Sequence, residues 1–182
     1  TAGGEAIPMT TKGVNSSRPR WSPDGKYLAF LSARGSGEKD GPKTQVWTLN
    51  RSGGEAQQLT ETIQGVSSFE WSPKGDRLVL VLSDPSPEEL EAAEAKEKSI
   101  EKIKPSTPKP WVIDRLQFKR DNAGYLDRLR SHFYVCELAS KKLTQVTSGD
   151  YDDEDPAWSP DGRFLVFTSN RSEDPDHNFN SD

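Results

Sequence analysis

The sequence predicts an all-β protein, a segment of a β-propeller built from four-stranded antiparallel blades with a helical insertion in the second blade. The phrase WSPDGKYLAF from Trp21 returns as WSPKGDRLVL from Trp71 and as WSPDGRFLVF from Trp158. The first two copies are 50 residues apart, and a threonine stands eleven residues before each tryptophan. A repeat period of this size, with short apolar runs in each repeat, is typical of propeller blades.

Each copy predicts a tight turn followed by a buried strand. In Ser-Pro-Asp-Gly the proline presets φ and the glycine tolerates a positive φ, and Lys74 in place of Asp is compatible with a type I turn. The apolar runs 27–31, 77–82 and 164–167 do not alternate with polar residues, so both faces of each strand are expected to lie between neighbouring sheets. We expect each tryptophan to pack between blades. The structural repeat residues are Trp21, Pro23, Gly25, Trp71, Pro73, Gly75, Trp158, Pro160 and Gly162.

The repeat unit divides the chain into blades. One strand ends at Trp, one follows the turn, one resembles QVWTLN and one resembles AQQLT. The predicted parts are the outer strand of a preceding blade (1–12), a complete blade (18–60), a second blade with an insertion (67–147, insertion 84–130) and the first half of a third (155–182). Propellers have about four to eight blades. We therefore expect a segment of a longer propeller, with exposed strand edges through which two copies could pair.

The insertion predicts a helix and then an extended hairpin. Ser86 suits the N-cap, Pro87 the first helical position, and Glu89 completes a capping box. Lys104-Pro105 is expected to end the helix. Its apolar stripe is narrow, so we expect a solvated helix on the rim, and a docking surface for a partner is the alternative. A turn is expected at 121–124, between the segments WVIDRLQFKR and YLDRLRSH.

Composition and charge argue against several classes of protein. The net charge is −5 and the basic residues are scattered, so nucleic acid is not an expected partner. No run approaches the ~18 apolar residues of a membrane helix, so a membrane partner is not expected either. The first residues lack the features of a signal peptide. The lone Cys136 needs no oxidising compartment and is expected to be a packed thiol. We therefore expect a cytoplasmic location.

Catalytic motifs are missing from the sequence. It contains no G-x-S-x-G phrase, no phosphate-binding glycine loop and only two histidines. His132 opens a predicted strand, where we expect a surface or edge position. The acidic stretch 150–158 is expected to be a solvated loop between blades. The tail 174–182 alternates oxygen-bearing side chains but lacks the glycine and glutamate of a calcium loop, so we expect no metal and no cofactor.

The repeats resemble TolB-like propeller repeats. The chain is more similar to the N-terminal propeller of the prolyl oligopeptidase family, on its acylaminoacyl-peptidase and dipeptidyl-peptidase-like branch. The resemblance rests on VIDRLQFKRDNAGYLDRLRSHFYV (112–135), QVTSGDYDDEDPAWSPDGRFLVFTSNR (145–171) and EDPDHNFNSD (173–182). It implies a serine peptidase whose catalytic triad lies in a C-terminal α/β-hydrolase domain, so no catalytic residue can be assigned to this chain.

The resemblance implies a propeller that caps the active site, filters peptide substrates and catalyses nothing itself. Its implied partners are the α/β-hydrolase domain of the parent chain and short peptides. Arg115, Arg120 and Tyr125 are candidate substrate-binding residues, because arginines there could pair with a peptide carboxylate; a solvated hairpin is the alternative. Two other functions stay open. One is a non-enzymatic TolB-like propeller that binds a protein partner, and the other is a lactonase-like enzyme, which would need converging metal ligands.

Overall fold

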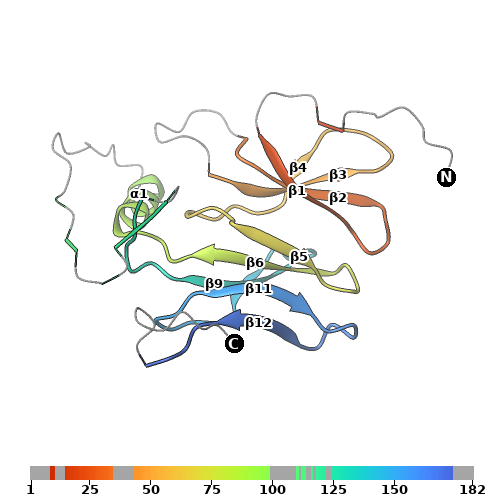
Figure 1. Cartoon of the computed structure of the whole chain (residues 1–182). Helices are drawn as coiled ribbons and strands as arrows, with labels where there is room; N and C mark the ends of the chain where they lie inside the picture. Colours follow the sequence, from red (N-terminus) through yellow and green to blue (C-terminus); the bar gives the residue numbers. More distant parts are fainter. Residues whose placement is uncertain are drawn as a thin grey trace.

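The computed structural model describes residues 9–10, 15–34, 43–98, 110, 112–113, 116, 118–121 and 124–173, and it consists of stacked antiparallel sheets (Figure 1). The first sheet has the order β1 (Ser16–Trp21), β2 (Tyr27–Ser32), β3 (Gln45–Asn50) and β4 (Gln57–Gln58). The second has β5 (Ser68–Trp71), β6 (Arg77–Ser83), β9 (Ser131–Glu137) and β10 (Leu143–Gln145), with β5 at one edge and β10 at the other. β11 (Asp153–Trp158) and β12 (Leu165–Ser169) form a third pair. The predicted all-β propeller class is confirmed.

The insertion between β6 and β9 contains α1 (Pro87–Glu97) and a small hairpin of β7 (Lys119–Arg120) and β8 (Gly124–Tyr125). Ser86 accepts a hydrogen bond from the Glu89 backbone, and the Glu89 side chain accepts one from the Ser86 backbone, so the predicted capping box is confirmed. α1 buries none of its residues, as expected for a solvated helix. No helix in the described part of the chain has the length and the apolar composition needed to cross a membrane.

The hydrophobic core lies between the sheets, and β6 contributes side chains to it from both of its faces. Leu78, Leu80 and Leu82 pack with residues of the first sheet such as Leu31, whereas alternate residues of β6 pack toward the third sheet. Because successive strand residues point to opposite faces, a strand between two sheets must be apolar throughout. Burying each such side chain contributes about 1.5–3 kcal/mol, so the contacts between sheets dominate the stability.

β12 departs from this expectation. Leu165 and Phe167 pack against the second sheet, but Phe164 and Val166 are 62% and 68% exposed. The prediction that both faces of 164–167 are buried is therefore wrong for the described residues, since none of them forms a sheet on the other side of β12.

Each of the three turns contains a hydrogen bond from its serine hydroxyl to a carboxylate. In the first, the Ser22 hydroxyl donates to Asp24 and accepts from the Tyr27 backbone, and Gly25 N–H donates to the Ser22 carbonyl. The bonds from Ser22 and from the Lys26 backbone lower the pKa of Asp24 to about 2. The third turn repeats the pattern with Ser159 and Asp161 at the same positions.

The second turn uses a different carboxylate. Lys74 occupies the position of the missing aspartate, and the Ser72 hydroxyl donates instead to Asp76, 2.8 Å away. The same hydroxyl accepts from the Arg77 backbone at 3.1 Å. The bond from Ser72 outweighs the modest effect of burial and lowers the pKa of Asp76. The serine–carboxylate pair is therefore retained although its sequence position has moved.

Each turn lies against the next one. Gly75 has φ +69°, and a Cβ there would be 3.2 Å from Cδ of Pro23. Gly162 has φ +70°, and a Cβ there would be 3.5 Å from Cδ of Pro73. The proline of one turn therefore fits over the glycine of the following turn. Among the repeat residues, Trp71 also packs into the core between the first two sheets, and Trp158 into the core of the next pair.

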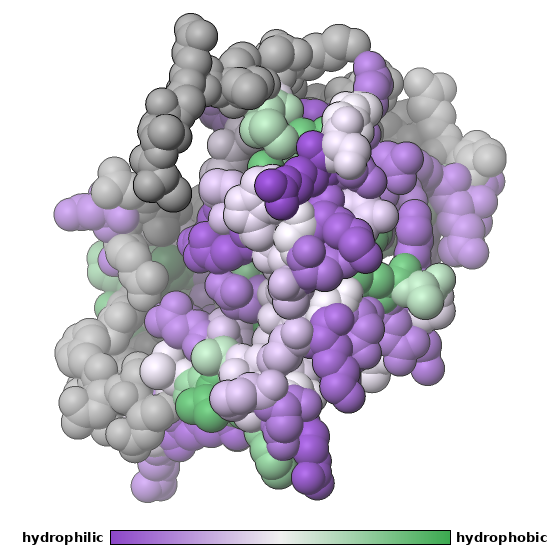
Figure 2. Space-filling view, turned by 90° about the vertical axis from the view of Figure 1, so that its right-hand side faces the viewer, coloured by the Kyte–Doolittle hydropathy of each residue, from purple (hydrophilic) through white to green (hydrophobic). Residues whose placement is uncertain are grey.

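The face formed by the turns is mostly hydrophilic, with small and separate apolar areas (Figure 2). Trp21 is half exposed, in contrast to Trp71 and Trp158, which pack into the interior. The other end of the sheets, where the insertion lies in Figure 1, carries a denser set of polar contacts.

Candidate functional site

The base of the insertion is closed by hydrogen bonds between its two ends. Asp84 N–H donates to the Arg130 carbonyl at 2.7 Å, and Arg130 N–H donates to the Asp84 carboxylate at 3.1 Å. Ser83 and Ser131 pair directly beneath these residues as the last step of the β6–β9 ladder. The insertion thus leaves and rejoins the second sheet at one point.

The Arg130 side chain connects this point to the loop before β11. The side chain is 9% exposed, and its guanidinium donates to Asp150 at 2.8 Å and to Asp152 at 3.3 Å. Burial disfavours the charged guanidinium, but the two carboxylates outweigh this effect and raise the pKa of Arg130. Asp152 also accepts from the Ser131 backbone at 2.9 Å. These bonds hold the insertion against the approach to the third sheet.

A buried network lies beside this junction. Asp153 is fully buried, and its carboxylate contacts His132 Nδ1 at 3.3 Å and Arg171 at 3.0 Å. Burial opposes the charge on Asp153, but hydrogen bonds from Thr147, Ser169, Arg171 and His132 outweigh it and lower the pKa of this carboxyl group. A buried carboxylate is stable only with such partners.

Two expectations from the sequence are corrected by this network. His132 is 2% exposed rather than at the surface, and the stretch expected to be a solvated loop contains β11 and the buried Asp153. The other ring nitrogen of His132, Nε2, is 3.9 Å from Asp84. Both ring nitrogens therefore face carboxylates, an arrangement that suits a structural histidine better than a catalytic base.

The repeated threonine has a structural role at the same end of the sheets. The Thr147 hydroxyl accepts from the Phe133 backbone at 2.9 Å, and Thr60 does the same for Val46 at 2.9 Å. Thr60 also donates to Gln45, the residue that corresponds to His132 in the first sheet. In the first and second sheets, the threonine therefore binds the start of the third strand to the chain segment that follows the fourth strand.

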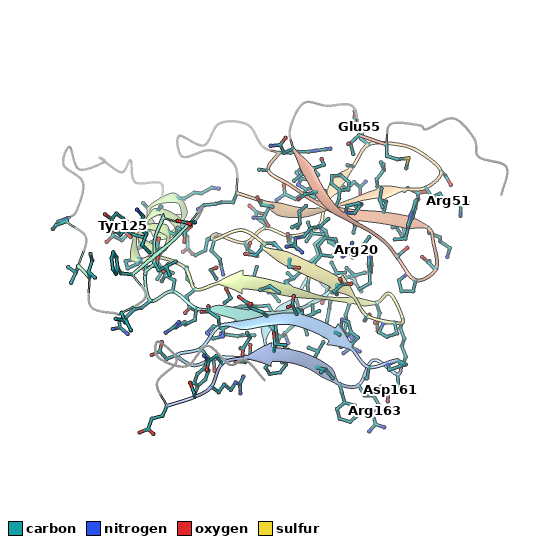
Figure 3. The ribbon with its side chains drawn as sticks, viewed as in Figure 1. Arg20, Arg51, Glu55, Tyr125, Asp161 and Arg163 are labelled. Carbon is teal, nitrogen blue, oxygen red and sulfur yellow. The ribbon has the colours of Figure 1, made fainter. Side chains whose placement is uncertain are left out.

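The predicted substrate-binding residues are only partly described. Arg115 lies outside the described residues, and so does the side chain of Arg120. Tyr125, labelled in Figure 3, is 48% exposed and stacks on Phe118 with ring centroids 6.5 Å apart. The β7–β8 ladder pairs the Arg120 backbone with Gly124, the neighbour of Tyr125, and the role of this set stays a prediction. The tail 174–182 also lies outside the described residues.

The first sheet contacts the insertion through an ion pair. Lys43, just before β3, donates to Glu89 in the first turn of α1. Burial opposes the charge on Glu89, but the bonds from Lys43 and the Ser86 backbone outweigh it and lower the pKa of this carboxyl group.

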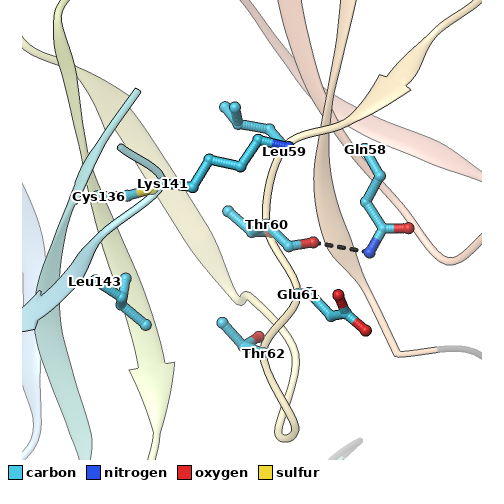
Figure 4. Close-up of a pocket in the computed structure, with 8 residues that line it drawn as sticks. All are labelled: Gln58, Leu59, Thr60, Glu61, Thr62, Cys136, Lys141 and Leu143. Carbon is cyan, nitrogen blue, oxygen red and sulfur yellow. Dashed lines mark hydrogen bonds between the residues drawn. The ribbon is translucent and has the colours of Figure 1, made fainter. Parts of the chain in front are cut away.

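A cavity of about 460 Å³ opens between the outer parts of the first two sheets (Figure 4). Thr60, Glu61 and Thr62 line one side, and Cys136, Lys141 and Leu143 line the other. Burial raises the pKa of the Cys136 thiol, and the thiol is packed, as expected. In the described part of the chain, no group of three or more His, Cys, Asp or Glu residues could hold a metal ion.

Comparisons with known proteins agree with the fold. No family model matches the chain. The acylaminoacyl peptidase of Pyrococcus horikoshii superposes with a TM-score of 0.55 at 20% identity, over 84% of this chain and 20% of that one. TolB of Acinetobacter baumannii superposes with a TM-score of 0.50 at 19% identity, over 88% of this chain and 28% of that one. The chain is thus part of a β-propeller of the kind found in TolB and acylaminoacyl peptidases.

A curated relative is more similar in sequence than these structures. The chain is 33% identical over 176 residues to the uncharacterized peptidase YuxL of Bacillus subtilis (strain 168). The match covers 97% of this chain and 25% of the relative, so the chain spans a quarter of that peptidase. These relatives indicate the propeller domain of a peptidase.

Proposed function

We propose that the chain forms part of a propeller that covers the active site of a serine peptidase of the acylaminoacyl-peptidase type, filters peptide substrates, and has no catalytic activity of its own. The observation that carries the proposal is the match of nearly the whole chain to a quarter of a peptidase. The catalytic domain would be the remaining partner in the parent protein, and short peptides its substrates.

The insertion end is the side that we assign to the catalytic domain. Arg130 and its two carboxylates fix the insertion to the sheets there, and Tyr125 is exposed on it. A rigidly attached projection can restrict the size of a substrate, because it keeps its position when a peptide presses against it. Arg115 and Arg120 would pair with the carboxylate of a peptide, with Tyr125 beside them.

The experiment compares the 182-residue chain with the longer protein that contains it. An active-site fluorophosphonate probe should label the longer protein and not the chain, and the longer protein should hydrolyse short acylated peptides. Replacing residues 85–129 with a short Gly-Ser turn should increase hydrolysis of longer peptides relative to dipeptides. An unchanged preference would contradict the filter.

A second candidate is a non-enzymatic TolB-like propeller that binds a protein partner, and the superposition on TolB favours it. In that case the longer protein would not react with the fluorophosphonate probe and would hydrolyse no acylated peptide. Substitution of Arg115, Arg120 or Tyr125 would then leave no kinetic effect to measure.

A further inference from the structure

The innermost strand β1 has an unusual backbone at Arg18. This residue has φ 51°, in the left-handed region that residues with a side chain rarely adopt. The β1–β2 register shifts between Ser17 and Arg20, so Arg18 lies in a bulge of the strand. The corresponding residue of the third sheet, Asp155, has the same φ and a similar register shift.

Each of these two bulges includes a proline, Pro19 or Pro156, which has no N–H to donate to the ladder. In the second sheet the corresponding residue is Ser68, and β5 pairs with β6 there in a regular ladder. A bulge also re-aims the side chains of its residues. The question is therefore what the side chain of Arg18 does.

Arg18 and Arg20 both reach across to β5, at the surface where the inner strands face the propeller axis. Arg18 Nη1 donates to the Ser68 hydroxyl at 3.4 Å, and Arg20 Nε donates to the Glu70 carboxylate at 3.3 Å. The Arg20 and Glu70 side chains are 48% and 39% exposed. Figure 3 shows Arg20 between the first sheet and β5.

The charged groups in these two contacts do not balance. Two guanidinium groups face one carboxylate, and the bond of Arg18 is a long one to a neutral hydroxyl. Guanidinium groups bind carboxylates through paired N–H donors, and such charge-assisted bonds are stronger than bonds to a hydroxyl. A ligand with one carboxylate would give Arg18 a charged partner and would balance the charges of the two guanidinium groups and Glu70.

We propose that Arg18 and Arg20 form a binding site for a single carboxylate on the axis-facing surface of β1 and β5. The ligand class is a small monocarboxylate, and in the parent protein a short peptide would supply it through a carboxylate other than the one assigned to Arg115 and Arg120. Only this source of the ligand rests on the proposed function. The site lies on the inner strands and uses none of the insertion residues discussed above.

The test is a titration of the 182-residue chain at low ionic strength, followed by backbone amide NMR. The probes are N-acetylglycylglycine, its C-terminal amide, and N-acetylaspartate amide, which carries its carboxylate on a side chain. The two acids should shift the amide signals of Ser68 and Glu70, and the amide of N-acetylglycylglycine should not. Shifts with N-acetylglycylglycine alone would assign the site to a peptide C-terminus; shifts with both acids would assign it to carboxylates in general.

The variants separate binding from folding. Arg18→Gly tolerates the left-handed backbone and should weaken binding at least fivefold without lowering stability. Arg20→Gln should also weaken binding, whereas Glu70→Gln should strengthen it by removing the competing carboxylate. Arg163→Gln, on the turn face, is the control and should bind like the parent chain.

Equal shifts with the neutral probe, or an unchanged affinity in Arg18→Gly, would overturn the site. Either result leaves the peptidase proposal intact, since hydrolysis is measured separately.

Discussion

Pro23 of the first turn lies so close to Gly75 of the second that a Cβ at Gly75 would come within 3.2 Å of the proline Cδ. Gly25, at the same position of the first turn, also has a positive φ, but an added Cβ would meet nothing within 4 Å. The two glycines therefore have the same backbone requirement, and only Gly75 has the additional steric one.

This pair gives a prediction with an internal control. Gly25→Ala should lower the free energy of unfolding by about 1 kcal/mol, the cost of a left-handed alanine. Gly75→Ala should lower it by more, since Pro23 must also move. Urea denaturation of both variants measures the difference. Equal losses would show that the turns do not support one another.

Asp153 should make stability depend on acid pH. The pKa of Asp153 is lowered in the folded chain. Its contribution to the free energy of unfolding is therefore complete above the unfolded pKa of about 3.9, and it is lost as the pH falls through the lower folded pKa. Asp153→Asn should cost about 2–3 kcal/mol at pH 7, because it removes charged hydrogen bonds from a buried site. The variant should also lose less stability than the parent chain between pH 5 and pH 2. Parallel pH profiles would contradict this assignment.

Arg130 should control the attachment of the insertion. Arg130→Gln removes two charge-assisted bonds at the base and should cost about 2 kcal/mol or less, because both aspartates are partly exposed. Amide exchange of α1 and of Gly124–Tyr125 should become faster, while the centre of β6, at Val79, should change little. Mass-spectrometric hydrogen exchange measures both regions. Arg51→Gln on the turn face is the control, and uniform acceleration throughout the variant would indicate global destabilisation instead.

Cys136 should react slowly with thiol reagents. The thiol is 2% exposed and burial raises its pKa, so little thiolate is available at neutral pH. Reaction with a chromogenic disulfide should be at least a hundredfold slower in the native chain than in urea. A native rate close to that of the unfolded chain would show that the neighbouring cavity opens to admit the reagent.

Short-range patterns could be read from the sequence because they depend on neighbouring residues. The apolar run of β6 and the capping box at Ser86 follow from local rules and are present as expected. The move of the turn carboxylate to Asp76 is also a local change. A position-by-position comparison of the repeats misses it, because the residue aligned with the aspartates of the other turns is Lys74.

The burial of charged residues could not be read in this way. Asp153 lies within an acidic stretch that is typical of a solvated loop, and its partners Thr147, His132 and Arg171 come from other parts of the chain. Only the packing of the third sheet against β9 brings them together. Likewise, the half-exposed face of β12 depends on which sheet lies beside it, a property that the strand sequence does not encode.

The closed base of the insertion has a consequence for how such a protein can evolve. Asp84 and Arg130 already meet through the ladder and two further hydrogen bonds, so the chain between them forms a loop whose ends are fixed by the sheet. Doubling the length of a flexible loop adds only about 0.6 kcal/mol of closure entropy. The segment between these residues can therefore lengthen, shorten or be exchanged for an unrelated module at little thermodynamic cost. Natural selection can vary what projects from this blade while the blade itself stays the same.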